Sequence, residues 1–348
     1  MQASFHNVVI PALGHVLPQE IWSSEAMEEQ LHETYHRLHL SVGRLELMTG
    51  IRERRIWHPG MLASRAAASA AQALFEGHPG AQLHTIDLII NASVCRDRLE
   101  PATASYVHHL LSLPSHTQAF DLSNACLGFI NAMWVAASQI ECGLIRSALI
   151  VSGENSRPLL ESTLQALQNP SLDRHQIKPY FANLTIGSAS VAMLLCHRHL
   201  APTAPRLLGG SALADTNACH LCEGDAMSDS WQMQTDSEAL LHAGIALARR
   251  NWPIFLQQIH WKTSSIHHFI SHQVGKRHQE QFYEALELDR QKDFSTFSFL
   301  GNTGSVALPI TLSIAWGQQR FRPGDRVALL GIGSGLHSIM MGIEFPKI

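Results

Sequence analysis

Residues 119–143, AFDLSNACLGFINAMWVAASQIECG, decide how the rest of the chain is arranged. A short apolar run is followed by Ser123 and Asn124, and then by a segment that is apolar on nearly every side of a helix. A helix without a polar face is normally buried inside a large domain, and Gly143 provides a plausible stop. We therefore expect a buried strand, a turn and a buried helix, with Cys126 at the joint.

The position of Cys126 allows two interpretations. A thiol in the first turn of a buried helix lies close to unpaired backbone N–H groups and to the positive end of the helix dipole. Both favour the thiolate, which is the nucleophilic form of cysteine. The alternative is an inert cysteine of the core, because free cysteines are among the most buried residues. This stretch alone leaves both interpretations open.

Length and composition limit the class of protein. The 348 residues suffice for one large core or for two fused halves. Hydrophobic residues make up 45% of the chain and charged residues only 16%, which indicates an extensive interior and a surface partly buried in an oligomer. The net charge of −4 indicates no basic surface for nucleic acid. There is no apolar run of about 18 residues that would span a membrane, and the N-terminal residues lack the features of a secretory signal, so we expect a cytoplasmic protein.

The cysteines and histidines do not form a metal-binding pattern. The six cysteines are scattered without the spacing of a disulfide framework, as is typical of a reducing compartment. Cys219 and Cys222 form a single CxxC pair, without a second pair or a strand-to-helix context. Among the 22 histidines, the nearest approach to a cluster is His267, His268 and His272, and no HExxH spacing occurs. We therefore expect neither a metal nor a cofactor.

Apolar strand-like runs alternate with helical segments in both halves of the chain. The runs at residues 87–97 and 147–155 have counterparts at residues 266–273 and 326–335. This pattern predicts an α/β fold made of two duplicated halves with largely buried sheets. The segment APTAP, residues 201–205, is the candidate boundary between an N-terminal half (1–200) and a C-terminal half (201–348).

Three further local predictions concern helices and an arginine cluster. Residues 64–77 are Ala-rich and predicted to be helical, and residues 238–255 are predicted to be a helix whose end is disturbed by Pro253. Residues 45–57 are predicted to be an irregular link that carries Arg52, Arg54 and Arg55. The arginines belong either to a solvated loop with intramolecular partners or to a docking patch for a phosphate-bearing substrate.

Function in α/β folds gathers where strand ends meet helix starts. Three chemically versatile residues lie at such junctions: Cys126, His272 after a strand, and Asn302 in the turn GNTGS. Together they suggest acyl transfer, with Cys126 carrying the acyl group as a thioester and with His272 and Asn302 donating hydrogen bonds to an oxyanion. Taken singly, His272 is better explained as an interior histidine and Asn302 as a turn residue.

Four ordered motifs resemble those of one family. NACLGF, ISHQVGKRH and LGNTGSVALP resemble the Cys, HQ and GNT motifs of ketoacyl synthase III condensing enzymes, and TGIRERRIW resembles the TGIxxRR signature of the same family. The resemblance runs from about Val8 to Phe345. It implies a thiolase fold with layers in the order α-β-α-β-α, a homodimer, acyl-CoA or acyl-ACP substrates, and Cys126, His272 and Asn302 as the catalytic triad.

Other segments resemble the olefin-biosynthesis subgroup (OleA type), whose members join two fatty acyl-CoAs head to head. SVCRDRLEPATAS, DLSNACLGFINAM, ALIVSGEN and RVALLGIGSGL carry this resemblance. In the subgroup, a glutamate of the LEP segment, Glu100 here, reaches across the dimer and serves as general base for removal of an α-proton. LTIGSASVAMLL, from Leu184, lacks the acidic GDGAGA pattern of ordinary synthase III enzymes, and GIGSGLHS replaces their GGGFTWG.

The resemblance implies Claisen condensation of two fatty acyl thioesters to a β-keto product, and other activities remain open. The first is decarboxylative 3-oxoacyl-ACP synthase III activity with malonyl-ACP, and the second is a pyrone- or resorcinol-forming ketosynthase. From a different class, an acyl thioester hydrolase would use the same acyl-enzyme. A non-catalytic partner subunit would need a replacement in the triad, and the sequence has none. Acyl chain length and the choice between CoA and ACP cannot be predicted.

Overall fold

The computed structural model of the chain describes residues 1–81, 83–227 and 230–347. Within these residues, ten strands form one mixed sheet in the order β12-β13-β14-β9-β2-β8-β7-β5-β6, and β1 pairs with β9. These strands are β1 (Gln2–Ser4), β2 (Val8–Val16), β5 (Leu88–Asn91), β6 (Gln118–Asp121), β7 (Ser147–Glu154), β8 (Ala189–His197), β9 (Arg206–Ala214), β12 (His268–Ser271), β13 (Arg326–Gly333) and β14 (His337–Glu344).

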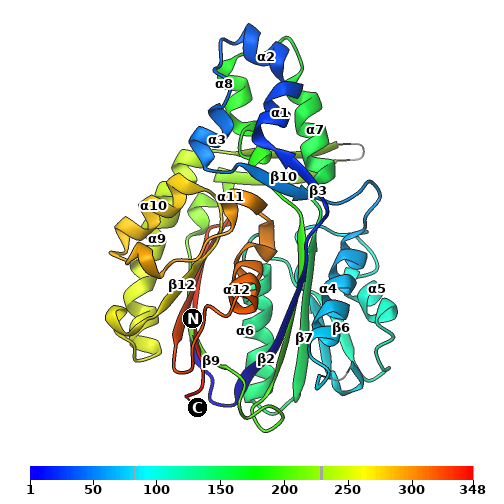
Figure 1. Cartoon of the computed structure of the whole chain (residues 1–348), viewed down its shortest axis with the longest axis vertical. Helices are drawn as coiled ribbons and strands as arrows, with labels where there is room; N and C mark the ends of the chain where they lie inside the picture. The colour runs from blue at the N-terminus through cyan, green and yellow to red at the C-terminus, as the bar shows by residue number, and fades with distance from the viewer. Residues whose placement is uncertain (82, 228–229, 348) are drawn as a thin grey trace.

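The elements stack in five layers (Figure 1). Two helices, α6 and α12, occupy the middle layer between two curved parts of the sheet, and two pairs of helices cover the outer faces. The layer order α-β-α-β-α that the family resemblance implied is confirmed. The six helices are α4 (Ala63–Gly77) and α5 (Thr103–Leu110) on one outer face, α6 (Gly128–Glu141) and α12 (Ala307–Gly317) in the middle, and α9 (Ser237–Gln258) and α10 (Lys276–Ala285) on the other outer face.

The strand pairing repeats itself in the two parts of the sheet. In one part β5 runs parallel to β7, which pairs antiparallel with β8. In the other part β12 runs parallel to β13, which pairs antiparallel with β14. The strand runs that the sequence analysis matched between the halves therefore occupy equivalent places. The two parts meet where β2 pairs with β9 through Val9 and Arg206.

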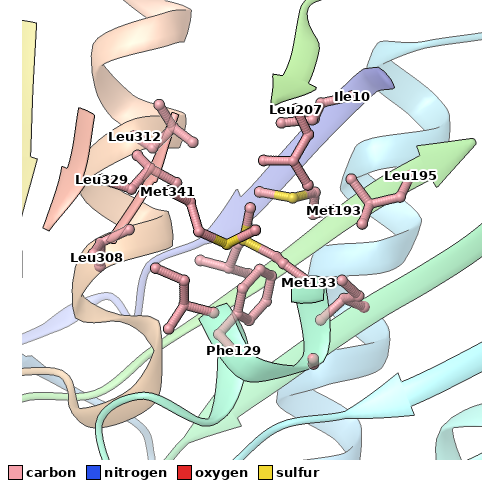
Figure 2. Close-up of a cluster of buried hydrophobic side chains, with 14 of the residues drawn as sticks. Ile10, Phe129, Met133, Met193, Leu195, Leu207, Leu308, Leu312, Leu329 and Met341 are labelled. Carbon is pink, nitrogen blue, oxygen red and sulfur yellow. The ribbon is translucent and has the colours of Figure 1, made fainter. Parts of the chain in front are cut away.

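The central helices bury most of their side chains, as the apolar pattern predicted: α12 buries every residue from Ala307 to Ala315, and α6 leaves one stripe, which includes Asn131, Val135 and Ser138, partly exposed. Phe129 and Met133 of α6 and Leu308 and Leu312 of α12 point into one cluster between the two parts of the sheet (Figure 2). The strands contribute Ile10, Met193, Leu195, Leu207, Leu329 and Met341 to this cluster. The apolar segment ends as expected, because Gly143 (φ +72°) follows the last residues of α6. In the described part of the chain, no helix combines the length and apolar character needed to cross a bilayer.

A cap of short elements lies above the layers, at the top of Figure 1. Its helices pack around their own cluster of buried side chains, which includes Met27, Leu45 and Leu160. The remaining elements are α1 (Ser24–Gln30), α2 (His32–Arg37), α3 (Arg44–Thr49), α7 (Arg157–Leu167), α8 (Arg174–Ile177), α11 (Phe297–Leu300), β3 (Glu20–Ser23), β4 (Glu53–Ile56), β10 (Cys222–Met227) and β11 (Ser230–Thr235).

Two local predictions were wrong. Residues 45–57 do not form an irregular link, because they contain most of α3 and the whole of β4, which pairs with β3. The helix predicted over 238–255 does not end at Pro253 but continues through it to Gln258. A proline removes one helical hydrogen bond. The burial of Trp252 and Phe255 against the sheet holds α9 together across that position.

The first turn of α6 leaves no space for a side chain at Gly128. A Cβ atom built there would lie 2.5 Å from the carbonyl oxygen of Ala92. We predict that Gly128→Ala lowers the free energy of unfolding by about 1–3 kcal/mol, because the backbone must move to relieve the overlap. Gly77→Ala is the matched control, since nothing lies within 4 Å of its built Cβ atom. In urea denaturation at equal protein concentration, Gly77→Ala should be neutral or slightly stabilising. Equal stability of the two variants would contradict the prediction.

Candidate active site

Cys126 lies in the turn between β6 and α6, before the helix begins at Gly128. The expected position in the first helical turn was therefore wrong. Ala125, directly before the thiol, has φ 44°, a left-handed conformation that is uncommon for a residue with a side chain. The N–H of Gly128 donates to the carbonyl of Ala125 (3.1 Å) and closes the turn. This geometry places the half-buried thiol just outside the helix.

The electrostatic surroundings of Cys126 also differ from the prediction. The pKa of the Cys126 thiol is raised to about 12. Burial is the largest cause, followed by the nearby Cys222 and the carboxylate of Glu154. Burial opposes ionisation because the low-polarity interior solvates a thiolate poorly. The free enzyme therefore holds a neutral thiol at physiological pH, and the predicted stabilisation of a thiolate by the helix is outweighed.

His272 follows the last residue of β12, and its backbone N–H donates to the carbonyl of Leu330 in β13 (3.0 Å). Burial, together with the nearby His278, lowers the pKa of His272 to about 3, so the imidazole is neutral. Among the described residues, nothing forms a hydrogen bond with its buried Nδ1 atom. A cavity of about 10 Å³ adjoins the ring, lined by Ser271, His272, His278, Gln279, Phe282, Leu330 and Ile332.

Asn302 is held by its backbone and by its side-chain oxygen. Its N–H donates to the carbonyl of Thr185 (2.9 Å), and its carbonyl accepts from the N–H of Gly187 (2.9 Å). Its Oδ1 accepts from the backbone N–H of Gly304 (3.1 Å). Since Oδ1 is engaged within the turn, the Nδ2 group is the part of the Asn302 amide that remains to donate a hydrogen bond to another group. Gly301 has φ +67°, and a Cβ there would lie 2.4 Å from the carbonyl oxygen of Thr185, so the turn requires glycine.

Strand β13 connects the surroundings of His272 with those of Cys126. Leu330 accepts the hydrogen bond from His272, and further along the strand Gly331 and Gly333 contact Leu127, the neighbour of Cys126. Cβ atoms built on these glycines would lie 2.7 and 2.9 Å from the Leu127 side chain. The turn that begins with Asn302 packs against the Glu154 carboxylate at the end of β7, and Glu154 is near enough to Cys126 to act on its thiol, so the three residues predicted from sequence lie on neighbouring segments at one end of the central layer.

Glu100 does not join them within one chain. It lies on the loop between β5 and α5, and its side chain is exposed. No described residue forms a hydrogen bond or an ion pair with it. The same loop also exposes Val94 (44%) and Leu99 (93%), so apolar surface accompanies Glu100.

The arginine cluster is not a single patch. The side chain of Arg54 is fully buried and donates to the carbonyls of Trp22 (3.2 Å) and Leu184 (2.7 Å) and to the hydroxyl of Ser24 (3.1 Å). Burial lowers its pKa to about 10, which still leaves it charged at neutral pH. Arg54 thus ties the cap to the segment before Thr185. It has the intramolecular partners of the first interpretation but is not solvated, and its burial leaves it no access to a phosphate-bearing substrate.

The thiols and histidines form no metal site in the described residues, where no group of three or more His, Cys, Asp or Glu side chains could hold an ion. All six cysteines are free, and Cys219 is exposed.

Two polar residues of the site were missed in the sequence. Gln273 is buried, and its Oε1 accepts from the backbone N–H groups of Thr296 (2.9 Å) and Phe297 (3.3 Å), so it supports the loop that leads to Asn302. Glu154 ends β7 and is only 4% exposed. A carboxylate at the end of a strand that is otherwise buried on both faces is the signal that would have identified Glu154.

The sequence model of 3-oxoacyl-[acyl-carrier-protein] synthase III matches residues 120–166, and the model of its C-terminal part matches residues 256–344. The first range contains Cys126, and the second contains His272 and Asn302. With the five-layered fold and the site just described, these matches define a thiolase-fold condensing enzyme of the synthase III type, which is an acyl-transferring class of enzyme.

Two curated relatives are acyl-CoA:acyl-CoA alkyltransferases. The protein of Xanthomonas campestris is 38% identical over 97% of this chain and 98% of its own length, and that of Shewanella oneidensis is 35% identical over 98% and 99%. A β-ketoacyl-[acyl-carrier-protein] synthase III of Bacillus cereus is 25% identical over 97% and 98%. The crystal structure of cerulenin-bound Xanthomonas campestris OleA superposes with a TM-score of 0.94 at 36% identity, covering 98% of both chains. The chain belongs to the acyl-CoA:acyl-CoA alkyltransferase (OleA) family.

The high pKa of Cys126 gives a testable pH dependence. Iodoacetamide reacts with the thiolate, so the alkylation rate of Cys126 should rise about tenfold per pH unit from pH 7 to pH 10 without levelling off. Peptide mapping by mass spectrometry at each pH measures this rate, and glutathione is the reference thiol, with a rate that levels off above its ordinary pKa. A rate for Cys126 that is already constant below pH 8 would show a stabilised thiolate instead.

Proposed function

We propose that this protein condenses two fatty acyl thioesters by a Claisen reaction, with acyl-CoA as substrate. The observation that carries the proposal is the placement of Cys126, His272 and Asn302 at one end of the central layer, in a fold that superposes on OleA. A structure of Xanthomonas campestris OleA contains lauric acid and lauroyl-CoA, and it matches this chain with a TM-score of 0.94. Solved forms of that protein also include substitutions of a cysteine, a histidine and a glutamate.

In the first step, the sulfur of Cys126 attacks the carbonyl carbon of an acyl-CoA. A carbon–sulfur bond to the enzyme forms, the bond to CoA breaks, and the departing CoA sulfur takes up the proton that Cys126 loses. Because Cys126 and His272 are both uncharged in the free enzyme, the resting site contains no thiolate–imidazolium pair.

In the second step, an α-proton leaves a second acyl thioester and negative charge develops on its carbonyl oxygen. In this proposal, His272 and Asn302 donate hydrogen bonds to the oxyanion. A neutral imidazole donates through only one nitrogen, and the amide of Asn302 has its Nδ2 group free because Oδ1 is engaged with Gly304. The enolate carbon then attacks the acyl group on Cys126, and the carbon–sulfur bond to the enzyme breaks. The departing Cys126 sulfur takes up the proton that the base removed, and a β-keto thioester is released.

The base that removes the α-proton is Glu100 of a second subunit in a homodimer. Its exposed side chain finds no partner among the described residues of its own chain. Val94 and Leu99 of the same loop, with Leu110 of α5 (42% exposed), give this region the apolar surface that an interface buries.

The proposal also includes the domain division and the location of the protein. Residues 201–205 form the boundary between two thiolase-like halves, and the protein works in the cytoplasm.

The acyl-enzyme is tested by intact mass. Lauroyl-CoA should add one acyl mass to the wild type and to Cys142→Ser, the exposed-cysteine control, but none to Cys126→Ser. His272→Ala and Asn302→Ala should still acylate, while their condensation rates fall by about 10²–10³ because each loses one oxyanion donor. A persistent adduct on Cys126→Ser, or normal condensation by either of the other two variants, would contradict the assignments.

The action of Glu100 in trans is tested by mixing two inactive chains. Cys126→Ser and Glu100→Gln should each lack condensing activity as homodimers. When both chains are co-expressed with different tags and the mixed dimer is purified, one of its two sites has an intact cysteine and an intact partner glutamate. The mixed dimer should therefore regain up to half of the wild-type rate. No activity in the mixed dimer would place Glu100 in its own subunit's site or outside the reaction.

A further inference from the structure

Glu154 is a buried carboxylate surrounded by hydrogen-bond donors. Its Oε1 accepts from the N–H of Val94 (2.8 Å), the N–H of Ser305 (3.3 Å) and the hydroxyl of Ser305 (2.5 Å). Its Oε2 accepts from the N–H of Cys95 (3.1 Å). No arginine, lysine or histidine in the described residues forms an ion pair with it. Uncharged hydrogen-bond donors from two separate loops therefore offset the free-energy cost of burying this carboxylate.

Each of the two loops leads to a residue of the proposed reaction. Val94 and Cys95 begin the loop that carries Glu100, while Ser305 lies in the turn that begins with Asn302. A Cβ atom built on Gly304 would lie 3.3 Å from the Glu154 carboxyl carbon, so this turn packs directly against the carboxylate. The N–H of the same Gly304 holds Oδ1 of Asn302. Glu154 thus fixes the turn that orients the Asn302 amide.

Glu154 itself is held rigidly by the sheet. Its backbone carbonyl accepts from Nε1 of Trp57 (3.0 Å). The hydroxyls of Ser305 and Ser152 lie 2.8 Å apart, and Ser152 donates to the hydroxyl of Ser93 (3.2 Å), which also accepts from the N–H of Gly153 (2.9 Å). The two loops are therefore anchored to β7 at neighbouring points, through the Ser152 hydroxyl and through the Glu154 carboxylate, which accepts hydrogen bonds from both loops.

We propose that Glu154 is a positioning residue for the condensation step. Its carboxylate fixes the turn that orients the Asn302 amide relative to the first residues of the loop that carries Glu100. This inference rests on the proposed function. Its charge also acts on Cys126, whose pKa it raises together with Cys222. Position and charge have different experimental signatures, because position affects the second step and charge affects the reactivity of the thiol.

Glu154→Gln separates the two half-reactions. A glutamine presents one oxygen and one NH₂ group, so one of the two loops meets a donor where it needs an acceptor. Acylation of Cys126 by lauroyl-CoA should stay within about threefold of wild type, while the condensation rate falls about 10–100-fold, the scale of a displacement of about 1 Å. At fixed pH, iodoacetamide should alkylate Cys126 faster, because loss of the negative charge lowers the thiol pKa.

Two further variants control the experiment. Glu141→Gln is the matched control, because Glu141 also accepts from two backbone N–H groups, those of His6 (2.9 Å) and Asn7 (2.9 Å), at the far end of α6. It should change neither half-reaction. Ser305→Ala removes one donor and keeps the charge, so it should slow condensation selectively without speeding alkylation. If Glu154→Gln does not fold, the test rests on Ser305→Ala, whose condensation rate should fall while its acylation rate stays unchanged.

The proposal is overturned if Glu154→Gln or Ser305→Ala lowers acylation and condensation by the same factor, or lowers neither. Failure of the proposed function is a separate result, since it would show in the wild type as a missing acyl adduct or a missing condensed product.

Discussion

The burial of two helices between two layers of strands is the constraint on which the rest of this structure depends. Helices α6 and α12 are apolar on nearly every side, so most of each helix must be covered, and this requirement produces the five layers (Figure 1). It also leaves only the helix ends for chemistry. Cys126 lies in the turn before α6, two residues ahead of Gly128, and Asn302 begins the turn that leads into α12. The ends of β7 and β12 bring Glu154 and His272 to the same end of the layer.

A site placed at this depth is governed by desolvation. The Cys126 thiol and the His272 imidazole are both kept uncharged, and the burial of each is the largest cause. Such a site favours apolar groups, because charged groups would hold water in it. The backbone compensates for the missing charges: the Asn302 turn, the loop of Val94 and the Glu154 carboxylate are joined by N–H donors at fixed positions. Reactivity therefore depends on position more than on charge.

Much of this could be predicted from sequence, because apolar runs such as 147–155 report burial and because the order of the Cys, HQ and GNT motifs is specific. The alternation of strands and helices, the layer order and the junctions with Cys126, His272 and Asn302 follow from these features. What the sequence could not show depends on contacts between distant segments. Nothing near Arg54 indicates that it will be buried and donate to the carbonyl of Leu184. The causes that raise the pKa of Cys126, burial first and then Cys222 and Glu154, likewise come from distant segments. Pro253 was misjudged because a local rule took no account of the packing around α9.

A Claisen condensation of two acyl-CoAs differs from the decarboxylative reaction in the origin of the nucleophilic carbon. The most direct measurement is product analysis after incubation with lauroyl-CoA labelled with ¹³C at its carbonyl carbon, with no malonyl thioester present. The proposed reaction predicts a β-keto product that contains two complete acyl chains and carries the label at both C1 and C3. Formation of condensed product only after addition of malonyl-CoA or malonyl-ACP, with one CO₂ released per product and a single labelled carbon, would contradict it.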